Sequence, residues 1–138
     1  DQNKPYILAK TFWFIENAKT DIPGYYYQQA KKYVNRVSSH PDQSSEYNGC
    51  ARADSEQGLI TFYDCFFTGD LESSDEFNFI NRASNIVHEV RHLELGDISK
   101  HVDCNGIKGA CDRYYSEDPR EALPYSYENI YLKDIIGT

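Results

Sequence analysis

The chain has 138 residues, 40% of them hydrophobic, and a formal net charge of −8 at pH 7. This length fits one domain with its own hydrophobic core, so we expect a single domain over 1–138. The negative charge argues against nucleic acid and anionic lipid as partners, and no apolar run approaches the ~20 residues that span a bilayer.

Two features predict a secreted or periplasmic protein. The chain has four cysteines, an even number that is typical of disulfide-bonded proteins outside the cytosol. It begins at Asp1 and contains no Met, so we expect a mature chain from which a signal peptide has been removed. Of the three possible disulfide connectivities we expect the local one, Cys50 with Cys65 and Cys104 with Cys111.

The first half of the chain predicts a short amphipathic element, a helix and a strand. Residues 10–19 form a short amphipathic element that ends in a turn at 21–24. Residues 25–38 carry apolar side chains at helical spacing and predict a helix, which a polar loop follows over 38–49. Residues 59–67, LITFYDCFF, are β-branched and aromatic and lie between glycines, which predicts a strand.

A long helix is predicted over residues 76–95. Ser74 or Asp75 can cap its N-terminus, and Gly96 is placed to end it. Residues 97–119 then predict a loop tied by the Cys104–Cys111 disulfide.

A last helix is predicted to open at Pro119. Because Pro124 must then sit in the first turn, the true start is expected nearer Leu123. The predicted fold class is therefore α+β, with a short β-sheet beside a long helix and a disulfide-tied loop.

Residues 88–92 of the long helix read HEVRH, an HExxH motif. His88 and His92 are four positions apart, so they share one helix face and can bind one metal ion. Glu89 lies ~100° round the helix from His88, where a carboxylate stands beside the metal and can take a proton from a bound water. Chance gives this motif in a chain of this length with a probability on the order of one in a hundred.

Helical phase adds a second argument for a metal site. Six apolar residues share one arc of the long helix and predict its core side: Phe79, Ala83, Ile86, Val87, Val90 and Leu93. His88 and His92 fall on the opposite arc, with Asn81, Ser84 and Leu95, so we expect them to face away from the core. The alternative is a pair of solvent-facing histidines that bind no metal.

A strand, an acidic turn and a helix bearing VHEVRH resemble the core of the zincin metallopeptidases, over residues 57–130. The resemblance implies a zincin-like domain that holds Zn²⁺ and hydrolyses peptide or protein substrates. In this family a zinc-bound water, deprotonated by Glu89, would attack a peptide carbonyl. Zinc would stabilise the oxyanion with help from a Tyr hydroxyl or a His N–H.

The third zinc ligand has several candidates, since a catalytic zinc usually has three protein ligands. In the metzincin pattern HExxHxxGxxH, Gly96 comes one residue late and His101 three residues late. His101 can still reach the metal if the chain folds back after Gly96. Asp112 is the rival, because residues 109–115, GACDRYY, are similar to the GTxDxxY stretch of the aspzincins, with Ala in place of Thr.

Glu121 and Glu128 on the last helix would make a gluzincin-like site, although no NExxS/A pattern supports them and solvated surface carboxylates are favoured. We rank His101 first, Asp112 second and either glutamate third. Arg91, inside the motif, is expected to form a local ion pair with Glu94 or Asp97.

Two functions remain open at this point. The first is a secreted zinc peptidase. The second is a non-catalytic secreted binding module with a structural or vestigial zinc site, which the 12 tyrosines and the acidic surface favour. The sequence does not define the oligomeric state.

Overall fold

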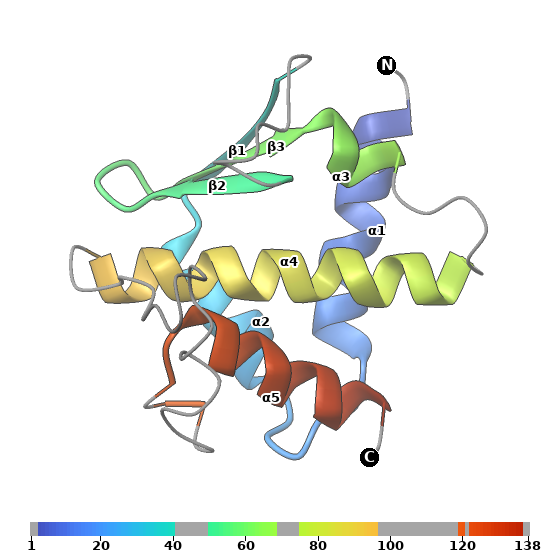
Figure 1. Ribbon diagram of the computed structural model, residues 1–138, viewed down its shortest axis with the longest axis vertical. Coiled ribbons are helices and arrows are strands. Elements are labelled where there is room, and N and C mark those ends of the chain that lie inside the picture. Colours follow the sequence, from blue (N-terminus) through green and yellow to red (C-terminus); the bar gives the residue numbers. More distant parts are fainter. Residues whose placement is uncertain (1–2, 41–49, 69–74, 97–118, 121, 137–138) are drawn as a thin grey trace, which may run out of the picture.

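The computed structural model describes residues 3–40, 50–68, 75–96, 119–120 and 122–136. Over these residues the protein is an α+β structure, as predicted, with five helices and a three-stranded sheet. Its elements, in chain order, are α1 (Asn3–Asn17), α2 (Tyr25–Tyr33), β1 (Arg36–His40), β2 (Ala51–Asp54), β3 (Leu59–Tyr63), α3 (Asp64–Thr68), α4 (Asp75–Leu95) and α5 (Pro124–Ile136) (Figure 1).

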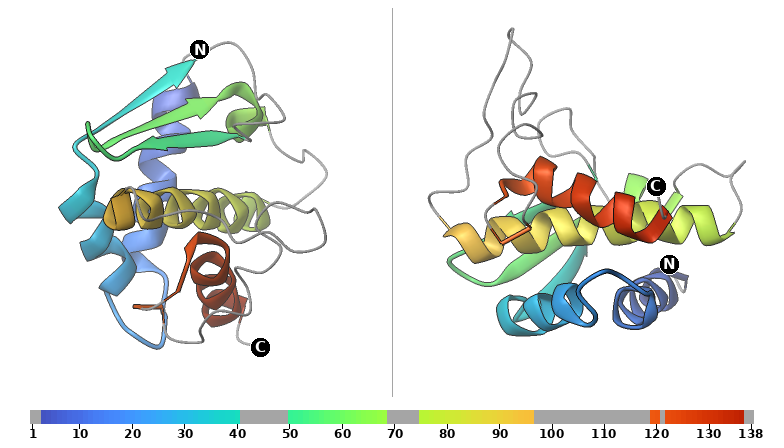
Figure 2. Two further views of the ribbon diagram at one scale, coloured as in Figure 1. Left: turned by 60° about the vertical axis from the view of Figure 1, so that its left-hand side comes forward. Right: turned by 90° about the horizontal axis from the view of Figure 1, so that it is seen from below.

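The long helix α4 lies at the centre of the molecule. The sheet covers one side of it, α5 covers the opposite side, and α1 and α2 lie behind it (Figures 1 and 2). Because β2, α1, α2 and α5 all contact α4, this helix is buried over most of its circumference. The HExxH motif therefore lies between the sheet and α5, not on an outer surface.

The sheet has the strand order β1-β3-β2. Strand β1 pairs parallel to β3, and β2 pairs antiparallel to it, with Ala53 opposite Ile60. Tyr63 donates its N–H to the carbonyl of Cys50, so these two residues form a hydrogen-bonded pair of the antiparallel ladder. Since such pairs alternate along an antiparallel ladder, the backbone groups of Ala51 and Ala53 point to the free edge, beside α4.

The predicted helix over 25–38 ends early and a strand replaces its second half. Helix α2 stops at Tyr33, and Val34 has extended backbone angles (φ −88, ψ 108). The N–H groups of Asn35 and Arg36 both donate to the carbonyl of Gly58, and β1 then pairs with β3. Pairing with a strand distant in the sequence outweighs the helical spacing, so the prediction was wrong beyond residue 33.

Three other element boundaries also differ from the prediction. Helix α1 begins at Asn3, seven residues before the predicted segment. The predicted strand over 59–67 ends at Tyr63, and the short helix α3 follows from Asp64. Strand β2 was not predicted. By contrast, α4 covers the predicted long helix and ends at Leu95, directly before Gly96, whose φ of 62° is the left-handed conformation that favours glycine.

The C-terminal helix α5 begins at Pro124, close to the predicted start. The Cys50–Cys65 disulfide is present as predicted and ties the beginning of β2 to α3. The predicted Cys104–Cys111 pair, and the loop that contains it, lie outside the described residues. A disulfide is compatible with an oxidising compartment.

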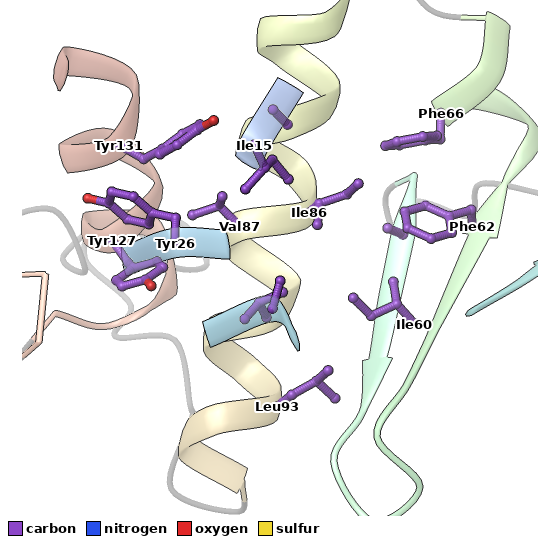
Figure 3. Close-up of a cluster of buried hydrophobic side chains, with 14 of the residues drawn as sticks. Ile15, Tyr26, Ile60, Phe62, Phe66, Ile86, Val87, Leu93, Tyr127 and Tyr131 are labelled. Carbon is purple, nitrogen blue, oxygen red and sulfur yellow. The ribbon is translucent and has the colours of Figure 1, made fainter. Parts of the chain in front are cut away.

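The hydrophobic core fills both sides of α4 (Figure 3). Phe62 and Phe66 pack on the side of the sheet, whereas Tyr26, Tyr127 and Tyr131 pack on the side of α2 and α5. The core arc predicted for α4 is confirmed, since all six of its apolar residues are buried: Phe79, Ala83, Ile86, Val87, Val90 and Leu93. Across the described residues, no helix has the length and apolar character needed to cross a membrane.

Candidate metal centre

The two histidines of the HExxH motif present the same ring nitrogen to each other. Nε2 of His88 lies 3.2 Å from Nε2 of His92, and the ring centroids are 4.9 Å apart. Two zinc–nitrogen bonds of ~2.0–2.1 Å at a tetrahedral angle would place the nitrogens about 3.3 Å apart. The spacing of the two Nε2 atoms therefore fits two ligands of one zinc ion.

The other ring nitrogen of His88 is occupied by a carboxylate from α5. Nδ1 of His88 lies 2.9 Å from Oε1 of Glu128, and the side chain of Glu128 is 22% exposed. A carboxylate on Nδ1 favours the tautomer that carries its proton there, and in this tautomer Nε2, the nitrogen that faces His92, carries the lone pair. The ring of Tyr125 stands edge-on to the same imidazole, with centroids 4.6 Å apart, and fixes its orientation.

This contact corrects two expectations drawn from the sequence. Glu128 is not a solvated surface carboxylate, because it is paired with His88. It also lies at Nδ1 and not at the Nε2 atoms that converge, which makes it a supporting group for His88 and a poor third ligand.

The prediction that His88 and His92 face away from the core was wrong for His88. The His88 residue is 7% exposed, and Arg91 and Ser84 are 3% and 4% exposed. Helix α5 packs on the arc of α4 that the helical wheel assigned to solvent, whereas His92 remains half-buried. A wheel shows which residues share a face but cannot show that a second helix covers it.

Glu89 is held between α4 and the edge of the sheet. It is 9% exposed, and its carboxylate accepts a hydrogen bond from the backbone N–H of Ala53 in β2. Burial raises the pKa of Glu89 to about 7; His88 and the Ala53 hydrogen bond oppose the shift, and Glu128 adds to it. A carboxyl group whose pKa lies near neutrality is suited to accept and return a proton.

The raised pKa of Glu89 predicts a pH-dependent stability for the metal-free protein. The pKa of Glu89 is about 7 in the folded protein, and its ordinary value, taken for the unfolded chain, is 4.5. The folded state therefore binds the proton more tightly. The stabilisation of the folded state by this proton is fully present below pH 4.5. It is lost as the pH rises through 7, and the free energy of unfolding falls by about 3 kcal/mol in all. Thermal unfolding of chelator-treated protein between pH 4.5 and 8 measures it.

The matched variant for that measurement is Glu89→Gln, which is neutral at every pH. Its unfolding temperature is expected to fall less than that of the wild-type protein between pH 5 and 8. If both proteins show the same pH dependence, Glu89 is not the responsible group.

The described residues bring together two candidate ligands, His88 and His92, whereas a catalytic zinc usually has three. Among them, no group of three or more His, Cys, Asp or Glu side chains gathers in a way that could hold a metal. The candidates His101, Asp112 and Glu121 all lie outside the described residues. The choice between His101 and Asp112 therefore stays a prediction.

A search of protein-family models, curated proteins and solved structures finds no match to this chain. The interpretation of the site therefore rests on the residues and contacts of this chain.

Sequence reasoning missed Ala53 and Tyr125, and it considered Glu128 only as a third ligand or a surface carboxylate, not as the partner of His88. Ala53 had no signal, since its role comes from a backbone N–H in a strand that was not predicted. Tyr125 and Glu128 lie three positions apart on α5, which places them on one helix face and is a signal that the sequence does carry. The expected ion pair of Arg91 is confirmed, with Nη1 2.9 Å from Oε2 of Glu94.

Proposed function

We propose that this protein is a zinc-dependent hydrolase of peptide or other amide bonds that is secreted or periplasmic. One observation carries the proposal: the Nε2 atoms of His88 and His92 converge at 3.2 Å while Glu128 occupies Nδ1 of His88. A metal-bound histidine usually donates its other ring N–H to a carboxylate, and the contact of Glu128 with Nδ1 of His88 supplies that partner. The buried Glu89 beside this pair supplies the base.

In the proposed site, His88 and His92 are two ligands of Zn²⁺, and His101 or Asp112 is the third. Zinc, when bound, supplies a Lewis acid that polarises the substrate carbonyl and acidifies water. Glu89 takes the proton from the attacking water and passes it to the leaving amine. The Ala53 N–H holds the Glu89 carboxylate against the sheet edge, so the base does not need to reorganise during proton transfer.

Metal content and activity together test the proposal. Protein purified without added metal should contain one zinc per chain and should hydrolyse unfolded protein substrates. A chelator should stop the hydrolysis, and stoichiometric zinc should restore it. A protein that has no metal and no affinity for zinc contradicts the proposal.

One observation favours a non-catalytic binding module as the second candidate. His88 is buried, and both of its ring nitrogens already have protein partners, Glu128 and His92. A zinc-edge X-ray absorption spectrum separates the candidates. Three protein ligands and one water support the hydrolase, whereas four protein ligands support a structural site.

Removing the Glu128 side chain is expected to weaken zinc binding without abolishing it. In Glu128→Ala, His88 loses the group that orients it, and zinc affinity should fall by about 10–100-fold. Glu128→Gln retains an oxygen that accepts from Nδ1–H and should lose less. Competition with a chromogenic chelator measures both. If Glu128→Ala loses zinc as completely as a variant of His92 does, Glu128 is a ligand and our assignment is wrong.

A further inference from the structure

Arg91 lies inside the HExxH motif, yet it makes its contacts with the chain that leads into α5. Its Nε donates to the carbonyl of Ala122 at 2.6 Å, and its Nη2 donates to the carbonyl of Arg120 at 3.1 Å. Its Nη1 forms the ion pair with Glu94, which is a charge contact without a directed hydrogen bond. The side chain is 3% exposed, so these contacts form out of water.

The segment that Arg91 holds immediately precedes α5. Ala122 is fully buried, and α5 begins two residues later at Pro124. The guanidinium also stacks 5.1 Å from the ring of Tyr127, in the first turn of α5. Arg91 thus contacts both the entry to α5 and its first turn.

Among the residues that the structure describes, α4 makes polar contacts with α5 and with the segment that leads into it at two positions three residues apart. These are the hydrogen bond of His88 to Glu128 and the group of Arg91 contacts. Both keep the same stretch of α5 in register with α4. A shift of α5 by about 1 Å would lengthen the 2.9 Å contact at Nδ1 beyond a useful hydrogen bond.

We propose that Arg91 is a positioning residue of the candidate site, which fixes α5 on α4 so that Glu128 holds His88 in its ligand orientation. The consequence for metal binding rests on the proposed zinc site, but the consequence for His88 does not. Arginine suits this role because its rigid fork of five donors can serve two carbonyls and a carboxylate together.

The same helix offers a matched control at its other end. Arg82 also donates to two backbone carbonyls, those of Phe66 and Phe67 at 2.8 and 2.9 Å, through its Nε and Nη2. It also stacks on an aromatic ring, that of Phe79, at 5.3 Å. However, its partners belong to α3, away from α5 and the histidine pair. Loss of either arginine removes a similar set of these contacts, but those of Arg91 hold the segment that leads into α5, the helix that carries Glu128, whereas those of Arg82 hold α3.

The experiment compares Arg91→Met, Arg91→Lys and Arg82→Met with the wild-type protein. In the metal-free proteins, imidazole ¹H–¹⁵N spectra report whether His88 carries a proton on Nδ1 that is protected by Glu128. We expect this signal to be lost or exchange-broadened in Arg91→Met, weakened in Arg91→Lys, and retained in Arg82→Met. Zinc affinity, measured by chelator competition, should fall by about 10-fold in Arg91→Met and stay unchanged in Arg82→Met.

Two results would overturn the inference. The first is that Arg91→Met keeps the wild-type Nδ1–H signal of His88 and the wild-type zinc affinity. The second is that Arg91→Met and Arg82→Met lose the signal and the affinity equally, which would indicate general destabilisation. Should Arg91→Met fail to fold, Arg91→Lys gives the answer: an unchanged His88 signal and zinc affinity contradict the inference. If the wild-type protein binds no zinc, the proposed function fails, while the metal-free spectra still decide the role of Arg91.

Discussion

Replacing Glu89 with Gln is expected to lower the rate of peptide hydrolysis by about 10²–10⁴-fold while the protein still binds zinc. The amide has the size of the carboxylate but cannot accept the proton of the attacking water. It can still accept the hydrogen bond from the Ala53 N–H, so the packing between α4 and β2 is preserved. Initial rates on an unfolded protein substrate, with zinc content measured on the same sample, give the result.

The control for this variant is Glu16→Gln. Glu16 lies exposed on α1, so its replacement changes the net charge by the same amount without touching the site. It should leave both rate and zinc content unchanged. Hydrolysis by Glu89→Gln at the wild-type rate would contradict the role of Glu89 as the base, and loss of zinc from this variant would mean that Glu89 acts as a ligand.

Replacing His92 with Ala is expected to lower zinc affinity by more than about 100-fold and to abolish hydrolysis with it, because a direct ligand contributes more than a supporting group. His92 is the better choice for this test because it is half-buried, whereas His88 is buried beneath α5. The fold should therefore survive the loss of the ring. Isothermal titration of the metal-free protein with zinc measures the affinity.

The matched variant is His40→Ala, which removes an exposed histidine at the end of β1. It should bind zinc as the wild-type protein does. If His92→Ala binds zinc with the affinity of His40→Ala, the converging pair is not a metal site. The buried, hydrogen-bonded arrangement of His88 would then favour the non-catalytic alternative.

The central helix and its motif could be predicted because their signals are local. An apolar repeat over four turns, an HExxH pattern and a glycine at the end all lie within residues 79–96. The Cys50–Cys65 disulfide was also predictable, since it joins cysteines close in the sequence. These predictions needed only spacing along one element.

Strands β1 and β2 were less predictable than the central helix, for two different reasons. Strand β1 has all five residues exposed, so it carries no alternation of buried and exposed positions. It forms because β3 offers it backbone partners, from Leu59 to Tyr63. Strand β2 pairs with a strand close in the sequence, since Asp54 lies opposite Leu59, but its four residues are too few to show a strand pattern.

By itself the sequence determined the fold class, the core side of α4 and the residue types of the candidate metal site, because these follow from periodicity and side-chain chemistry. Tertiary structure alone decided the surroundings of the site. The packing of α5 on α4 buried His88 and brought Glu128 to its Nδ1, and the free edge of β2 brought the Ala53 N–H to Glu89. Such contacts join residues about 36–40 positions apart, and no local pattern encodes which helix or strand edge will cover a given face.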